Sequence, residues 1–177
     1  MTVIPAGSIA ARLTLADGGN TAQKGAELEV VVKETFCLLD GVGVIKTNAV
    51  DVQQTAEIDI LLYNLRHPAG LPFLPDPILI ECKNWAAPVD SATVRSFTSK
   101  LQQFGLKFGI LVAANGITGD NTERQNAQGL LKTEFDRHNQ IILVLRRTEL
   151  ESLASSEELG MMLRDKYGSF IMGLPSF

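Results

Sequence analysis

The six residues from Ile78 to Lys83 constrain the fold of this 177-residue chain more than any other segment. They follow Pro77 and are apolar except for two charged side chains near their end. Successive side chains of a β-strand point to opposite faces, which gives Ile78, Ile80 and Cys82 on one face and Leu79, Glu81 and Lys83 on the other. The segment therefore predicts a strand with Glu81 and Lys83 side by side, roughly 6–7 Å apart along the strand.

The other periodic segments alternate between helical and strand spacing. Asn20 or Thr21 would cap a helix over about 22–39, and Asp90 or Ser91 opens a second helix. Strand patterns cover 42–47, 56–63, 108–113 and 141–145, and further helices are expected near 120–134 and 148–166, after a lead-in over residues 1–20. Helices that alternate with strands in the second half predict an α/β sandwich around a mixed sheet.

The strand over 56–63 carries a second acidic side chain. Its alternation places Ile58, Ile60 and Leu62 on one face, and Glu57 and Asp59 on the other. A proline-rich loop over residues 64–77 follows, which is long for a hairpin. If the strands on either side of this loop pair, Asp59 meets Glu81 near one end of the sheet.

The composition predicts one domain over residues 1–177. Hydrophobic residues make up 45% of the chain and charged residues 20%, and no run approaches the roughly 18 consecutive apolar residues of a membrane span. The start shows no secretory signal, and Cys37 and Cys82 both stand among apolar residues. We therefore expect a cytoplasmic protein with reduced cysteines and no membrane partner.

Two further observations bear on binding partners. No Cys-x-x-Cys occurs and the histidines His67 and His138 are isolated, so neither residue type shows metal-ligand spacing. The net charge of −4 disfavours a nucleic-acid partner, because phosphate contacts require Lys and Arg. It does not exclude one, since an acidic protein can carry a local basic surface.

The predicted meeting of Asp59 and Glu81 indicates a cation site. Two neighbouring carboxylates repel each other unless a cation lies between them, and hard oxygen ligands favour Mg²⁺. The carbonyl oxygen of Cys82 would add a ligand while its side chain packs in the core. Lys83 would then stand beside a metal-bound water, where it orients the water or stabilises charge on a phosphate.

A simpler interpretation of the same residues is a solvated surface with a cross-strand ion pair, because Glu-x-Lys tripeptides are common. Three features favour the chemical interpretation. Glu81 and Lys83 end an apolar strand, an Asp occupies the strand before it, and Asn84 and Trp85 follow directly. We expect Trp85 to serve packing, and assign it no substrate role.

These segments together resemble the restriction-endonuclease-like superfamily with its PD-(D/E)xK signature, and are most similar to its Mrr-type and Holliday-junction-resolvase-like branches. The resemblance covers about residues 22–147 and is carried by Lys24–Glu29, Ala56–Leu61, Ile78–Trp85, Pro88-Val89, Val94–Leu101, and Phe108–Val112 continuing to Ile117-Thr118. It implies a three-layer α/β/α sandwich with a central mixed sheet, flanked here by a lead-in and a C-terminal helix.

The resemblance also implies roles for individual residues. Asp59 and Glu81 match the metal-binding acids, Lys83 matches the catalytic lysine, and Glu27 matches the acid that the first helix brings to the site. An ordinary exposed helical Glu is an equal alternative for Glu27. The sequence departs from the signature in having Ile58 in place of the proline. It also carries the long 64–77 loop, which would contact substrate, mediate dimerisation or be a tolerated insertion; we favour the insertion.

The sequence thus predicts a Mg²⁺-dependent endonuclease, with Mn²⁺ as an alternative cofactor, that hydrolyses DNA in restriction and defence or in repair and recombination. RNA remains an alternative substrate. Candidate substrate contacts are Lys24, Arg95, Lys100 and Lys107, although such charges are often only a solvated face. One small domain grips few base pairs, so we expect a homodimer or a partner protein that supplies recognition. The alternative function is a catalytically silent module within a larger complex.

Overall fold

The computed structural model of the chain describes residues 2–50, 57–118 and 127–174. The helices within these residues are α1 (Ser8–Ala16), α2 (Thr21–Phe36), α3 (Ser91–Gln103), α4 (Ala127–His138), α5 (Arg147–Glu151) and α6 (Ser156–Ile171). The strands are β1 (Val42–Val50), β2 (Glu57–Asn64), β3 (Ile78–Lys83), β4 (Phe108–Ala113) and β5 (Ile141–Leu145).

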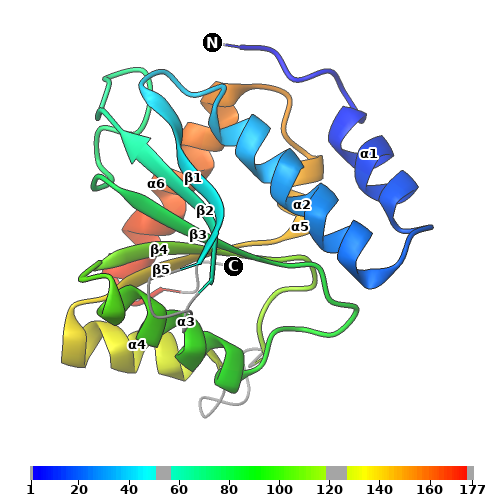
Figure 1. The fold of residues 1–177 in the computed structure, drawn as a ribbon. Helices are drawn as coiled ribbons and strands as arrows, with labels where there is room; N and C mark the ends of the chain where they lie inside the picture. Colours follow the sequence, from blue (N-terminus) through cyan, green and yellow to red (C-terminus); the bar gives the residue numbers. More distant parts are fainter. Residues whose placement is uncertain (1, 51–56, 119–126, 175–177) are drawn as a thin grey trace.

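The five strands form one mixed sheet in the order β1-β2-β3-β4-β5. β1, β2 and β3 pair antiparallel, whereas β3, β4 and β5 pair parallel. Helices α1, α2 and α6 lie on one face of the sheet, and α3 and α4 lie on the other (Figure 1). A buried apolar cluster fills each interface between the sheet and its helices. The predicted three-layer α/β/α sandwich is therefore confirmed.

Two helix starts follow from capping residues that the sequence singled out. Asn20 accepts a hydrogen bond from the backbone N–H of Gln23, and the Gln23 side chain accepts one from the Asn20 N–H, which completes a capping box. The Asp90 carboxylate accepts a hydrogen bond from the Thr93 N–H at the start of α3. These caps fix where α2 and α3 begin, and so which side chains they direct at the sheet.

Three predicted boundaries differ from the structure. The lead-in over 1–20 contains helix α1, whose Ile9 and Leu13 are buried although too few apolar residues repeat there to predict it. The predicted helix over 148–166 is two helices, because the chain is extended at Ser155, which bridges to Val3 and caps α6. Helix α4 is described over Ala127–His138 and ends beyond the predicted end at 134, and the earlier part of the predicted 120–134 helix lies outside the described residues.

The predicted faces of β2 are partly wrong. Ile60 and Leu62 pack in the cluster beneath α2 and α6, as expected, but Ile58 packs against the cluster on the α3 side. β2 pairs with β3 only over Ile60 to Leu62, whereas nearer its start it pairs with β1 alone. The first residues of β2 are thus released from β3, and their side chains need not follow the alternation of the rest.

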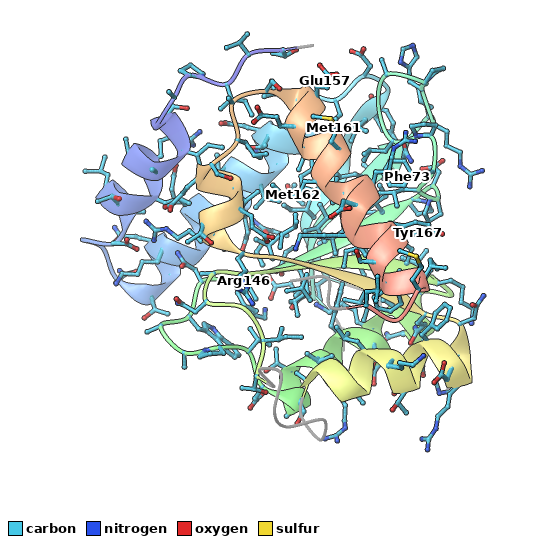
Figure 2. The ribbon with its side chains drawn as sticks, turned by 180° about the vertical axis from the view of Figure 1, so that it is seen from behind. Phe73, Arg146, Glu157, Met161, Met162 and Tyr167 are labelled. Carbon is cyan, nitrogen blue, oxygen red and sulfur yellow. The ribbon has the colours of Figure 1, made fainter. Side chains whose placement is uncertain are left out.

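The loop over 65–77 is built into the core. The buried Asn64 side-chain amide donates hydrogen bonds to the carbonyls of Leu71, Leu74 and Pro75. Figure 2 shows Phe73 beside Tyr167 of α6, with ring centroids 5.9 Å apart. The loop joins the end of β2 to the start of β3, which is the opposite end of β3 from Glu81 and Lys83. Its position therefore argues against direct contact with a substrate held at those residues.

The remaining expectations concern cysteines and membranes. Cys82 is buried as expected, whereas Cys37 at the end of α2 is exposed. Both thiols are free. Across the part of the chain that the structure describes, no helix has the length and apolar character to cross a membrane.

Candidate active site

Asp59 is held against β3 by its side chain. Its Oδ2 accepts a hydrogen bond from the backbone N–H of Cys82 at 2.7 Å, and the residue is only 9% exposed. The paired region of β2 and β3 ends at Ile60 opposite Ile80. Asp59 comes one residue before that pair. There the hydrogen bond to β3 is made by the Asp59 carboxylate and not by the backbone of β2. A carboxylate is thereby fixed beside the Glu81-Cys82-Lys83 tripeptide.

Glu81 is buried on the face of β3 that α3 covers. Its neighbour in the parallel ladder is Leu111 of β4, which packs in the α3 cluster. The Lys83 Nζ lies 2.7 Å from the Glu81 Oε1, and the Lys100 Nζ donates a hydrogen bond to the Glu81 Oε2. Both oxygens of one buried carboxylate thus contact ammonium groups, one from its own strand and one from helix α3.

Close packing of α3 on β4 brings Lys100 to this position. Gly109 of β4 has no side chain, and a Cβ there would stand 2.7 Å from the Phe97 ring and 3.1 Å from the Leu101 methyl groups. Phe97 and Leu101 are fully or almost fully buried. A glycine at this point allows the helix to approach the sheet closely. Lys100, one residue before Leu101, then reaches Glu81 from the side.

Burial and the charge of Glu81 act on the pKa values of Asp59 and Lys83. Burial, and next the charge of Glu81, raise the pKa of Asp59, and the hydrogen bond from Cys82 only partly offsets them. Burial alone would lower the pKa of Lys83, but the charge and hydrogen bond of Glu81, together with the charge of Asp59, outweigh it and the pKa of Lys83 is raised. Lys83 is therefore an ammonium ion at neutral pH, suited to donating hydrogen bonds rather than to accepting a proton.

Helix α2 contributes an acid to this region, and it is Glu29 rather than Glu27. Burial, and next the charge of Asp59, raise the pKa of Glu29, which also receives a hydrogen bond from the Asn48 side chain. Glu27 instead pairs with Arg12 of α1, 2.7 Å away. Two residues differ by about 200° around a helix, so these two acids face different ways. The sequence could not choose between them, because both flank the buried Leu28.

Asn48 of β1 is a second residue that the sequence did not single out. It lies between Thr47 and Ala49, which pair with Ile60 and Ile58, and so it stands across from Asp59. Its backbone is left-handed, with φ of 49°, which is uncommon for a residue other than glycine but most accessible to Asn and Asp. The only signal in the sequence was the residue type itself.

The other residues considered in the sequence analysis lie at different distances from Glu81. The Lys24 carbonyl accepts a hydrogen bond from the Asn84 side chain at 2.9 Å, which places the start of α2 beside the end of β3. Arg95 is exposed on α3. Lys107 donates to the His138 carbonyl, at the start of β4 and away from Glu81. Trp85, expected to be packed, is 41% exposed.

The donor set can be tested for its fit to a divalent metal. Within residues 2–50, 57–118 and 127–174, no three His, Cys, Asp or Glu side chains form a ready metal cluster. Mg²⁺ commonly binds through one or two carboxylates and keeps several waters. Asp59 and Glu81 are two buried carboxylates whose charges repel, and Asp59 is held beside Glu81 by a hydrogen bond from the Cys82 backbone N–H. Their chemistry fits Mg²⁺ or Mn²⁺.

The chain matches the sequence model of a known protein family. The sequence model of a family described as restriction endonuclease, the Mrr catalytic domain, matches residues 21–153. This range contains every residue of the site described above. No curated protein matches the chain.

Proposed function

Because this chain belongs to the Mrr-type restriction endonuclease family, we propose that it is a Mg²⁺-dependent endonuclease that hydrolyses phosphodiester bonds in DNA. One observation supports this proposal most strongly. The carboxylate of Asp59 is fixed to the Cys82 backbone, directly beside Glu81 and its partner Lys83. A buried set of two acids and a charged lysine is expensive to maintain for stability alone, and such sets concentrate at active sites.

Asp59 and Glu81 would hold the metal ion, together with the main-chain carbonyl of Cys82. When bound, Mg²⁺ supplies Lewis-acid polarisation of the phosphate and a more acidic water. Glu29 stands close enough to Asp59 for their charges to interact, so we assign it, in place of Glu27, the supporting role on α2. An outer carboxylate of this kind would orient the side chains that hold the metal.

Lys83 would act on the reacting phosphate. Its ammonium group is kept charged by Glu81, so it donates hydrogen bonds to the attacking water or to the phosphate oxygens. Negative charge grows on those oxygens in the transition state, and a fixed positive group stabilises it more than it stabilises the substrate. This role requires a lysine that stays protonated, and the raised pKa of Lys83 supports it.

The size and net charge of the protein bear on how it would bind a duplex. A single domain with a net charge of −4 offers limited contact to a duplex, so we propose a homodimer or a partner protein that supplies recognition. Lys24 and Arg95 remain candidate phosphate contacts. The two free thiols fit a reducing compartment, and we propose action in the cytoplasm in defence against foreign DNA or in repair and recombination.

A cleavage assay tests the proposal. Linear, circular and branched DNA, and RNA, are incubated with the protein and Mg²⁺, Mn²⁺ or EDTA, beside Glu81→Gln and Lys83→Met. Lys132→Met is the matched control, since Lys132 pairs with Asp136 on the surface of α4. We expect metal-dependent DNA cleavage by the wild type and the control only. Cleavage that persists in both site variants contradicts the assignment, and inactivity of the wild type on every substrate favours a silent module.

A further inference from the structure

The Lys100 side chain is largely buried, which is unusual for a lysine on a helix. Its side chain is only 11% exposed and that of its partner Glu81 is 9% exposed. Ion pairs on the surface are exposed and worth little, whereas a buried carboxylate requires compensation for lost hydration. Lys100 supplies that compensation at the Glu81 Oε2, and Lys83 supplies it at Oε1.

The two lysines differ in how they relate to the second acid. The charge of Lys83 acts on Asp59 more strongly than the charge of Lys100 does. Lys83 contacts Glu81 from the same strand, and its charge also acts on Asp59. Lys100 approaches Glu81 from α3 and acts chiefly on that residue. Withdrawing Lys100 would leave the contact between Lys83 and Glu81 in place.

A divalent ion that binds Glu81 needs a carboxylate oxygen, and both oxygens already contact ammonium groups. The formal charges show the conflict. Asp59, Glu81 and Glu29 carry three negative charges against two positive charges from the lysines, so the site is nearly neutral before any metal arrives. A divalent ion added to all five groups would reverse the sign of the site. Exchange of one ammonium contact for the metal lowers this repulsion.

We propose that Lys100 is a positioning residue that holds the Glu81 carboxylate in the metal-free protein and yields that oxygen to the divalent ion on binding. Lys100 thereby weakens metal affinity and raises the metal concentration at which the site assembles. Once released, its ammonium group lies beside the site, where it can contact a substrate phosphate. This inference rests on the proposed metal-dependent function and gives Lys100 a different first role from substrate binding.

Metal affinity and stability of Lys100→Met test the inference without reference to cleavage. The probe is Mn²⁺, with binding measured by calorimetry and unfolding followed by the thermal midpoint. We expect Lys100→Met to bind Mn²⁺ about tenfold more tightly, the scale of one lost hydrogen bond to a charged group. In EDTA its thermal midpoint should fall below that of the wild type, and saturating Mn²⁺ should remove the difference.

Three controls separate this exchange from a general charge effect. Lys132→Met removes a positive charge from α4 and should leave Mn²⁺ affinity unchanged. The tighter binding of Lys100→Met should persist in 0.5 M KCl, where long-range attraction is screened. Lys100→Gln removes the charge but keeps a hydrogen-bond donor for Glu81, so it serves if Lys100→Met fails to fold, and it should also bind Mn²⁺ more tightly.

The outcomes distinguish the two proposals. Wild-type binding of Mn²⁺ with equal or weaker binding by Lys100→Met and Lys100→Gln overturns the role of Lys100 and leaves the proposed function standing. Absence of Mn²⁺ binding by the wild type and both variants contradicts the metal-dependent function, and the role of Lys100 falls with it. Tighter binding that disappears in 0.5 M KCl also overturns the inference, because it shows a long-range charge effect.

Discussion

The carboxylate of Asp59 on β2 accepts a hydrogen bond from the backbone N–H of Cys82 on β3, at 2.7 Å. This bond aligns the acid of one strand with the centre of the Glu81-Cys82-Lys83 tripeptide on the next. It also takes up the Cys82 amide, so the Cys82 carbonyl would be the backbone group offered to the proposed metal ion. The consequences for stability and activity can be measured.

Replacement of Asp59 by Asn should stabilise the metal-free protein while removing function. Burial and the neighbouring Glu81 raise the pKa of Asp59, so its ionised form is disfavoured in the fold. An Asn side-chain oxygen still accepts the Cys82 N–H bond but carries no charge. In EDTA at pH 7 we expect a higher thermal midpoint than the wild type, with loss of the midpoint rise that Mn²⁺ produces. A lower midpoint in EDTA would show that the charge of Asp59 stabilises the fold.

The stability advantage of Asp59→Asn over the wild type should increase as pH rises. Because the folded pKa of Asp59 is raised, the native state binds more protons than the unfolded state between the two pKa values. The unfolding free energy of the wild type therefore falls as pH rises through this window. Glu29, whose pKa is also raised, contributes with the same sign.

Urea titrations in EDTA from pH 3 to pH 8 measure this dependence. The advantage of Asp59→Asn should be full above the folded pKa of Asp59 and vanish below the unfolded value, roughly 3.9. Binding of Mn²⁺ should weaken in acid, since it requires the ionised carboxylates of Asp59 and Glu81. An advantage that grows toward acid would contradict the assigned direction of the shift.

Substitution of Glu29 should lower metal affinity much more than substitution of Glu27. Glu29→Gln removes a charge that interacts with Asp59, and loss of an outer carboxylate typically costs about 10–100-fold in metal affinity or activity. Glu27→Gln breaks an ion pair with Arg12 that is 31% exposed on the Glu27 side, which costs less than about 1 kcal/mol. Equal effects of the two variants on Mn²⁺ binding and DNA cleavage would refute the assignment of Glu29.

Asn64→Ala should lower the free energy of unfolding and leave metal binding at the active site unchanged. The Asn64 amide bonds three carbonyls of the 65–77 loop, and its removal leaves those groups without their donor. We expect a loss of about 2–4 kcal/mol in the free energy of unfolding, measured in urea. The affinity for Mn²⁺ should stay within twofold of the wild type, because the loop lies at the far end of β3. A large loss of affinity in a folded variant would place the loop in the active site.

Much of the fold was accessible from the sequence because strong local signals agreed. The bounds predicted for Ile78–Lys83, Phe108–Ala113 and Ile141–Leu145 match β3, β4 and β5, since each is a short apolar run between clear turns. Helix α1 escaped prediction because it is short, and Gly7 at its start makes no side-chain cap. The break between α5 and α6 depends on pairing of Ser155 with distant Val3, which no local pattern encodes.

Part of the active site could also be predicted from local sequence patterns. Alternation along β3 is local, so the shared face of Glu81 and Lys83 could be predicted, and their contact follows. The choice between Glu27 and Glu29 depends on where Arg12 of α1 lies, and α1 was not expected. The pairing of Lys100 with Glu81 depends on how closely α3 packs on Gly109, which is a property of the assembled fold.

The single-turnover rate of DNA cleavage by Lys83→Met, relative to the wild type, tests the proposed active site most directly. Both proteins are first shown to have equal thermal midpoints in saturating Mn²⁺, so that a difference in rate reports chemistry. If Lys83 donates to the attacking water or the phosphate, the rate should fall by about 10²–10⁴-fold. A variant that cleaves DNA within threefold of the wild-type rate would contradict an active site built on Asp59, Glu81 and Lys83.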